Sequence, residues 1–212
     1  MPGYYLMALD VEGKKCVVAG GGKVAARKAL RLLEAGAQVV MVSVEFEGEI
    51  LNLPDVHLKR KEYETDDLEG ALLVIAATGD PEVNAKISRD ARARGILVNV
   101  ADEPKLSDFT VPAVMRRGNL LIGVSTSGAS PAVASSIKEE LEKQFGEQYG
   151  VYLEVIGELR SRVISEFPPG EKRREILRAL ARPEHMVTLK EKGEEAFRRE
   201  MLELVLRLGR DE

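Results

Sequence analysis

The feature that most constrains this 212-residue chain is a glycine-rich turn between a strand-like run and a helix-like run. Residues 15–19 (KCVVA) contain a short, uninterrupted apolar run with two β-branched valines, which predicts a buried strand. Three consecutive glycines follow, and residues 23–34 have a helix-forming sequence. A strand, a glycine turn and a helix in this order predict the opening unit of an α/β fold.

The glycine turn also has the spacing of a dinucleotide-binding loop, with Gly20, Gly22 and Ala25 at the small positions. Gly20 would allow the tight strand-to-helix turn, Gly22 would let the backbone approach a pyrophosphate, and Ala25 would let the helix pack closely. The pyrophosphate would lie at the helix N-terminus, whose free N–H groups and dipole favour an anion. The alternative is a glycine turn that only connects a strand to a helix.

An acidic residue follows the next strand at the distance expected for NAD binding. Residues 38–44 (QVVMVSV) predict this second strand, and Gly36 marks the end of the helix before it. Glu45 lies 23 residues after Gly22, where a carboxylate can bind the ribose hydroxyls of NAD and repel the extra phosphate of NADP. The alternative is that Glu45 is an exposed acid of the run EFEGE.

Three further strand-like runs continue the alternation of strand and helix, at residues 56–61, 71–77 and 96–100. A helix that begins at Pro81 and ends before Gly95 separates the last two. The alternation predicts a parallel sheet whose ligand lies beyond the carboxyl ends of the strands. Residues 4–9, ahead of the glycine turn, could add a short edge strand. The polar residues expected at the ligand edge are Glu45, Thr78, Asn99 and Asp102.

The pattern changes after residue 108. Residues 109–115 and 120–125 predict a β-hairpin with Arg116-Arg117-Gly118-Asn119 as its turn. Ser130 and Pro131 suit the N-cap and first position of a helix that continues to about residue 145. The C-terminal third is expected to be all-α, with helices over residues 149–166, 171–181 and 190–208.

Composition and charge exclude several other classes of protein. The net charge of −4 gives no basic excess for binding nucleic acid. No apolar run is long enough for a membrane span, and the N-terminus lacks a basic segment followed by an apolar core, so we expect a cytoplasmic protein. The single cysteine, Cys16, is expected to be a buried strand residue, and His57 and His185 are far apart. We therefore expect no fixed metal site.

Four motifs occur together in the order and at the spacing of a known family. They are VVAGGGKVAARK at residues 17–28, AATGDPEVN at 76–84, NVADEP at 99–104 and FTVPAV…GVSTSGASP within 109–131. With these motifs the chain resembles the siroheme synthase family, specifically its precorrin-2 dehydrogenase module. The resemblance implies a homodimer that uses NAD to oxidise precorrin-2, a tetrapyrrole, to sirohydrochlorin.

The resemblance also implies an order of domains in an α/β protein. An NAD-binding Rossmann domain with a parallel sheet is expected over residues 1–108. A small α+β dimerisation segment, made of the hairpin and the following helix, is expected over 109–146. An all-α C-terminal domain is expected over 147–212.

Roles for individual residues follow from the same resemblance. Asp102 falls on the family's acidic residue at the edge of the active site. Residues 125–130 match the serine-rich loop that faces the tetrapyrrole, although Thr126-Ser127 stands where relatives often have Ser-Gly. The expected cofactor-binding residues are Gly20, Gly21, Gly22, Lys23 and Val24 of the pyrophosphate loop, Ser43, Val44 and Glu45 beside the adenosine ribose, and Thr78 and Asn99 at the strand ends.

Oxidation of a reduced tetrapyrrole removes a hydride and a proton, and Asp102 is the candidate base. Its alternative roles are to cap a loop or to be an ordinary exposed acid. The substrate carries many carboxylates, so we expect anion-binding groups. These are Ser125, Thr126, Ser127 and Gly128 at the N-terminus of the Ser130 helix, and Arg116 with Arg117 in the hairpin turn. Their alternatives are helix capping and a solvated turn.

Two other functions fit the same residues. In the first, the protein is also a ferrochelatase, and Asp102 takes protons from pyrrole nitrogens while Fe²⁺ enters sirohydrochlorin as a substrate. In the second, the chain is a regulatory module that senses NAD, for which Asp102 and residues 125–130 have no evident use.

Overall fold

The computed structural model describes residues 3–210. They form two compact units, Gly3–Val111 and a second that begins at Pro112. Each unit has its own hydrophobic core, so the two are described in turn.

The first unit contains a five-stranded parallel sheet in the order β3-β2-β1-β4-β5. This order is that of the first five strands of a Rossmann sheet, in which the chain leaves the central strand β1 in one direction and later returns to its other side. All five predicted strands are present, with ends that differ by at most two residues from the sequence prediction. Their bounds are β1 Lys15–Ala19, β2 Gln38–Ser43, β3 His57–Arg60, β4 Leu73–Ala76 and β5 Leu97–Val100.

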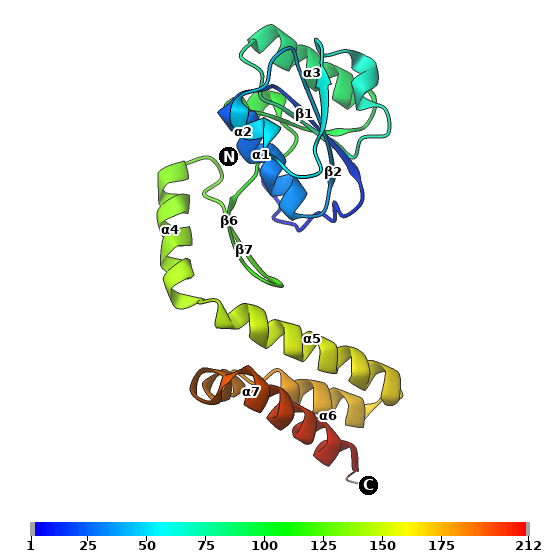
Figure 1. Ribbon diagram of the computed structural model, residues 1–212, viewed down its shortest axis with the longest axis vertical. Helices are drawn as coiled ribbons and strands as arrows, with labels where there is room; N and C mark the ends of the chain where they lie inside the picture. Colours follow the sequence, from blue (N-terminus) through cyan, green and yellow to red (C-terminus); the bar gives the residue numbers. More distant parts are fainter. Residues whose placement is uncertain (1–2, 211–212) are drawn as a thin grey trace. The chain divides into compact units, whose positions relative to one another are not determined.

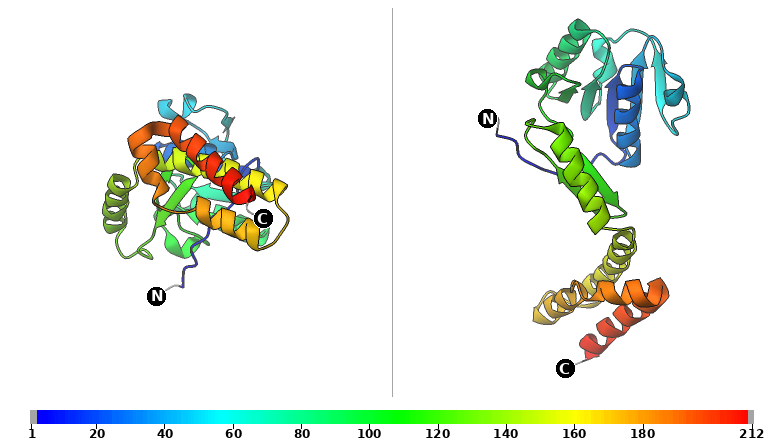
Figure 2. Two further views of the ribbon diagram at one scale, coloured as in Figure 1. Left: turned by 90° about the horizontal axis from the view of Figure 1, so that it is seen from below. Right: turned by 90° about the vertical axis from the view of Figure 1, so that its left-hand side faces the viewer.

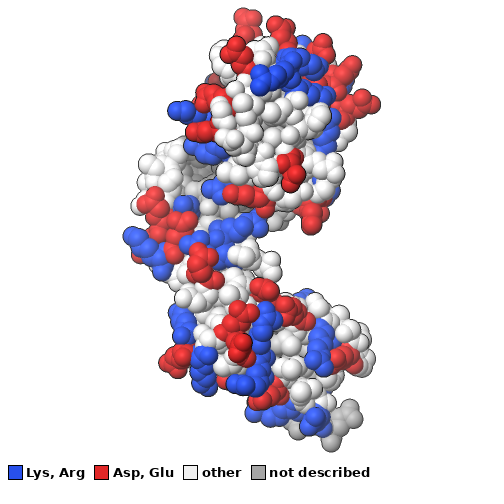
Figure 3. Space-filling model, in the orientation of Figure 1, with Lys and Arg blue, Asp and Glu red and all other residues white. Residues whose placement is uncertain are grey.

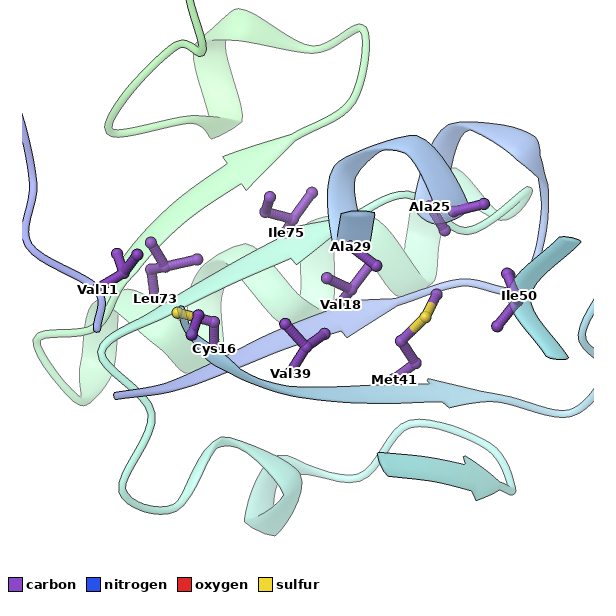
Figure 4. Packing of buried hydrophobic residues seen from close by; sticks show 12 residues of the cluster. Val11, Cys16, Val18, Ala25, Ala29, Val39, Met41, Ile50, Leu73 and Ile75 are labelled. Atoms are coloured by element: carbon purple, nitrogen blue, oxygen red, sulfur yellow. The ribbon is translucent and has the colours of Figure 1, made fainter. Parts of the chain in front are cut away.

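Helices α1 (Lys23–Glu34) and α3 (Pro81–Ala93) cover opposite faces of this sheet (Figure 1). Val17 and Val18 point to opposite faces because successive strand residues alternate. Val18 packs in one cluster with Ala25 and Ala29 of α1, and Figure 4 shows these side chains close together. Val17 packs in the other cluster, below α3. The helical elements of this unit are α1 Lys23–Glu34, α2 Gly48–Leu51 and α3 Pro81–Ala93, with 3-10 turns at Thr65–Leu68 and Pro104–Leu106.

The edge strand suggested for residues 4–9 is wrong, since residues 3–10 of the described chain form no strand. Tyr5 and Leu6 are 88% and 63% exposed. The apolar residues here are consecutive instead of alternating, so a strand would present no single apolar face to the core.

The second unit begins with a hairpin of β6 Ala113–Arg117 and β7 Leu120–Val124. The sequence prediction placed Arg116 and Arg117 in the turn, and this is wrong: both lie in β6, and only Gly118 and Asn119 connect the strands. Gly118 has a φ of 52°, and a glycine with positive φ at the first central position favours a tight two-residue hairpin turn.

Four helices complete the second unit: α4 Pro131–Gln144, α5 Gln148–Glu166, α6 Glu171–Leu180 and α7 His185–Arg210. The last helix begins earlier than predicted because two helices join at Gly193, whose φ of 81° breaks the helical backbone. Helices α5, α6 and α7 pack on one another (Figure 2) around Val155, Phe197 and Met201. Acidic and basic side chains are interspersed over the visible face of this unit (Figure 3).

Candidate functional site

The glycine loop is packed tightly between the ends of three strands. Gly20 has a φ of 130°, and its N–H donates to the Val42 carbonyl at 2.9 Å. A Cβ on Gly20 would overlap the carbonyl oxygen of Ala77, and one on Gly21 would overlap that of Glu45. The dinucleotide-binding motif accepts any residue at position 21. The spacing of the motif therefore does not reveal that packing requires glycine there.

Gly22 and the N-terminus of α1 form a cradle that suits an anion. Gly22 is the N-cap, no side chain caps the helix, and the first turn contains no acidic residue. The first intrahelical hydrogen bond joins Ala26 N–H to Gly22 O at 3.0 Å, so the N–H groups of Lys23 and Val24 precede it and both residues are exposed. A Cβ on Gly22 would meet only Glu47 Oε1, at 3.5 Å. The cradle therefore fits the pyrophosphate of a dinucleotide.

The segment after β2 is held against this loop. Glu47 N–H donates to the Gly21 carbonyl at 2.8 Å, and the carbonyl of Glu45 packs on Gly21. Ser43 ends β2 and is half-buried, whereas Val44 and Glu45 are exposed. The structure thus brings the residues predicted to bind the adenosine ribose next to those predicted to bind the pyrophosphate.

Thr78, after β4, has its hydroxyl engaged inside the protein. Its Oγ1 lies 2.7 Å from Asn84 Oδ1 and 3.0 Å from the Asp80 carbonyl, and Asn84 Nδ2 donates to the Thr78 carbonyl at 3.2 Å. Asp80 in turn caps α3 by accepting from Glu82 N–H at 2.8 Å. The Thr78 side chain therefore fixes the loop, and the buried Asn84 that holds it has no clear signal in the sequence.

Asn99 lies in β5 with one half of its amide unpaired. Its Nδ2 donates to the Phe109 carbonyl at 2.9 Å, while Oδ1 is buried without a hydrogen-bond partner in the described chain. Only 7% of Asn99 is exposed. A buried acceptor without a donor is costly unless a ligand or water supplies one.

Asp102 follows β5 as an exposed residue with a φ of 62°. Its carboxylate accepts no hydrogen bond from the described residues, so it does not cap the loop. Lys28 of α1 lies near enough for their charges to interact. Burial lowers the pKa of Lys28, the neighbouring Arg27 lowers it further, and Asp102 opposes both. Lys28 has no distinct signal in the sequence, because position 28 has the pattern of the edge of an ordinary amphipathic helix.

In the second unit, three of the loop hydroxyls form hydrogen bonds with backbone groups. Thr126 Oγ1 donates to the Ser130 carbonyl at 3.0 Å and accepts from Ser130 N–H at 3.1 Å. Ser130 Oγ accepts from Val133 N–H at 3.3 Å and caps α4 as expected. Ser125 Oγ accepts from Ser127 N–H at 3.2 Å. The exposed Ser127, with a φ of 54°, is left with a hydroxyl that makes no hydrogen bond in the described chain.

The two arginines of β6 differ in their surroundings. Arg117 Nε lies 3.1 Å from Glu147 Oε1, and its Nη1 donates to the Arg116 carbonyl at 2.9 Å. Arg116 is exposed. Arg117 therefore has an internal role beside α5, and Arg116 is the arginine available to a ligand. Arg116 and residues 125–128 belong to the second unit, whereas Asp102 belongs to the first.

Two further observations concern the described chain, residues 3–210. None of its helices combines the length and apolar character that crossing a membrane requires. Nor do its His, Cys, Asp and Glu side chains gather in a group of three or more that could hold a metal ion.

The strand order, the glycine loop and the uncapped helix N-terminus define the class of protein, a dinucleotide-binding Rossmann domain followed by a second unit. Residues 7–113 match the family described as Putative NAD(P)-binding, and residues 117–144 match the one described as Sirohaem biosynthesis protein central. The chain belongs to the siroheme synthase family, as its motifs predict.

Individual proteins agree with this assignment. A siroheme synthase of Methylococcus capsulatus is 38% identical over 199 residues, which cover 92% of this chain and 42% of that protein. One of Methylobacillus flagellatus is 39% identical over 175 residues, covering 78% of this chain and 36% of that protein. The chain thus spans less than half the length of these relatives.

A solved structure is similar over nearly the whole chain. SirC, precorrin-2 dehydrogenase, has a TM-score of 0.75 and 27% sequence identity, covering 96% of this chain and 100% of that one. The likeness confirms the predicted fold class, a parallel α/β domain followed by a helical region.

Proposed function

We propose that this protein oxidises precorrin-2 to sirohydrochlorin with NAD as the acceptor. The observation that carries the proposal is the free, exposed carboxylate of Asp102, which follows β5 in the same sheet that holds the glycine loop after β1. The family assignment and the similarity to SirC, precorrin-2 dehydrogenase, support it.

In this proposal, some residues of the first unit bind the cofactor and another accepts a proton from the substrate. Gly22, Lys23 and Val24 offer backbone N–H groups to the pyrophosphate, and Glu45 offers a carboxylate to the adenosine ribose, which favours NAD over NADP. When bound, NAD supplies the acceptor for a hydride. The substrate then has a proton left to lose, and a carboxylate oxygen of Asp102 accepts it.

The second unit would supply contacts to the carboxylates of the substrate. Ser127 has a free hydroxyl, Gly128 has open space around it, and Arg116 is exposed. In this proposal Thr126 and Ser130 shape the loop, and Ser125 orients Ser127.

Asp102→Asn tests the base. Asparagine tolerates a positive φ nearly as well as aspartate, so the variant removes the carboxylate without adding the backbone strain expected of alanine. We expect turnover of precorrin-2 to fall at least about 100-fold, while the Kd for NAD stays within about twofold. Glu103→Gln removes the next exposed acid and is the matched control.

Production of sirohydrochlorin is followed by its absorbance. A wild-type rate for Asp102→Asn would remove Asp102 from the mechanism. If the wild-type protein binds NAD but causes no spectral change with precorrin-2, the regulatory NAD-sensing module becomes the better assignment.

Iron insertion is a second candidate activity, favoured by the same unpartnered carboxylate. Asp102 would accept protons from the pyrrole nitrogens as Fe²⁺ enters, with the metal as a substrate. The test adds Fe²⁺ or Co²⁺ to sirohydrochlorin with the protein and compares the rate with that of the metal alone. Equal rates would restrict the function to oxidation.

The proposal also includes a cytoplasmic homodimer, with the domain bounds at residues 108 and 146 expected from the sequence. Apolar side chains of the second unit support an interface: Leu121, Val133 and Ile137 are 46%, 50% and 43% exposed. Light scattering after gel filtration should give twice the chain mass, and Ile137→Asp should shift it toward the monomer. A monomeric wild-type protein would contradict the dimer.

A further inference from the structure

Lys28 is a half-buried cation for which the proposed mechanism has no use. Its ammonium makes no hydrogen bond and no ion pair with any residue of the described chain. Burial lowers its pKa because the charged form loses hydration there, and the charge of Asp102 compensates only in part. A poorly hydrated cation that lacks a bonded anion suits an anionic ligand.

The position of Lys28 in the fold directs this cation toward the ligand edge. Helix side chains lean toward the helix N-terminus, and α1 starts at the carboxyl end of β1. From the second turn, the side chain of Lys28 therefore reaches back toward the carboxyl edge of the sheet. The carboxylate of Asp102, which follows β5, partly offsets the lowering of the Lys28 pKa, so the two groups lie within electrostatic range of each other.

Asn99 supplies a second, independent observation on the same face. It is in register with Ile75, which belongs to the cluster below α1, whereas Val98 and Val100 belong to the opposite cluster. The bond from Nδ2 to the Phe109 carbonyl fixes the orientation of the amide, so the buried Oδ1 is an acceptor without a donor. One face of the sheet edge thus holds an unbonded cation, an unfilled acceptor and a free carboxylate.

We propose that Lys28 binds a carboxylate of the tetrapyrrole substrate at this edge, while Asn99 Oδ1 accepts a hydrogen bond from an N–H group of the same ligand. The inference rests on the proposed function and extends it to the substrate-binding residues of the first unit. A reduced tetrapyrrole carries both carboxylates and pyrrole N–H groups. NAD is the poorer match for Lys28, because its pyrophosphate fits the α1 N-terminus and its oxidised nicotinamide ring is cationic.

Equilibrium binding of sirohydrochlorin, without turnover and with or without NAD, tests the assignment. Lys28→Met should weaken binding about tenfold, the loss expected for one charge-assisted hydrogen bond. Lys28→Arg should bind nearly as well as the wild type at pH 7. Arg27→Met removes the adjacent exposed cation and should stay within about twofold. The Kd for NAD should be the same in all four proteins.

A pH series adds a readout that a structural role would not produce. The wild type should lose affinity as pH rises through the lowered pKa of Lys28, below the usual 10.5 of lysine, whereas Lys28→Arg should keep it because a guanidinium stays charged. Of the groups on elements packed against α1, burial raises the pKa of Cys16 on β1 to about 11, and Glu49 on α2 is exposed. The other ionisable residues of α1 itself are Lys23, Arg27, Arg31 and Glu34.

The outcomes separate this inference from the function on which it rests. Unchanged sirohydrochlorin binding by Lys28→Met would overturn the role of Lys28 and leave the proposed function standing. A loss of NAD affinity in that variant would likewise overturn it, because Lys28 would then belong to the cofactor. A wild-type protein that binds no sirohydrochlorin would overturn the proposed function and this inference together.

Discussion

Gly21 and Gly22 are adjacent, yet the structure requires glycine at these positions for different reasons. A Cβ on Gly21 would overlap the Glu45 carbonyl, which is fixed by the end of β2, whereas a Cβ on Gly22 would have an ordinary contact with Glu47 Oε1 at 3.5 Å. Gly21 is thus constrained by packing. Gly22 has room for a side chain in the protein alone, so its requirement would come from a ligand.

Gly22→Ala should therefore weaken NAD binding without destabilising the fold. The added methyl group would occupy the approach of the pyrophosphate to the α1 N-terminus, and we expect the Kd for NAD to rise at least about tenfold. Thermal unfolding without NAD should shift by less than about 2 °C, since the site tolerates a Cβ. Calorimetric titration with NAD measures the first quantity and differential scanning fluorimetry the second.

Gly21→Ala is the contrasting variant. Its methyl group must displace backbone, which costs about 1–3 kcal/mol when a packed region is overfilled. We expect a lower melting temperature together with weaker NAD binding. If Gly22→Ala were the destabilised variant and Gly21→Ala were not, the packing argument for this loop would be wrong.

Lys28 should lower the stability of the protein in a pH-dependent way. Below the lowered folded-state pKa, lysine is protonated in both the folded and unfolded states, and the cost of burying the charge is present in full. As pH rises from that pKa to 10.5, the folded lysine loses its proton first and the cost disappears. Lys28→Met should thus raise the urea midpoint at pH 7, with a smaller gain at pH 10. Arg89→Met, on the exposed face of α3, should show no such pH dependence.

Single residues of this site differ in how well the sequence predicts them. Asp102 could be proposed from the sequence because it belongs to a motif of contiguous residues. Lys28 and Asn84 were not found, because their importance depends on neighbours that only the folded chain brings close: Asp102 for the first, and the backbone of Thr78 for the second. A half-buried lysine cannot be told from an exposed one by helical spacing alone.

At the scale of elements, strands and helices were predicted best where local chemistry defines their ends. Pro81 and the Ser130-Pro131 pair placed the starts of α3 and α4 correctly. The hairpin turn was misplaced because arginine is compatible with both strand and turn, and the backbone conformation of Gly118 decides between them. The sequence does not show the helix join at Gly193, because buried apolar residues recur at helical spacing both before and after it.

The loop before α4 permits a test that separates capping from ligand binding. Ser130→Ala removes the bond to Val133 N–H and should lower the free energy of unfolding by about 1 kcal/mol. Ser127→Ala removes a hydroxyl that bonds to nothing in the described chain, so stability should not change while the KM for precorrin-2 rises. Urea denaturation and steady-state rates measure the two effects. An unaltered KM in Ser127→Ala would leave this loop with a capping role only.

At the scale of the whole molecule, each of the two units has a hydrophobic core of its own. Two clusters on either side of the sheet stabilise the first unit, and one cluster around Phe197 stabilises the second. The Rossmann half was predictable in detail, because buried strands and a glycine loop leave strong local signals. The second unit was predictable only as a hairpin followed by helices, because periodicity does not encode which helix faces pack on one another.

Separate cores predict two unfolding transitions with different responses to NAD. A ligand stabilises only the cooperative unit that binds it, by about 2.7 kcal/mol at a free concentration 100 times its Kd. We therefore expect differential scanning calorimetry to resolve two transitions, of which NAD raises only the one that belongs to Gly3–Val111. Gly22→Ala, which keeps the fold but weakens the pyrophosphate site, should reduce that shift to about half or less. A single transition that moves as a whole with NAD would mean that the two units unfold as one, and that cofactor binding stabilises the helical half as well.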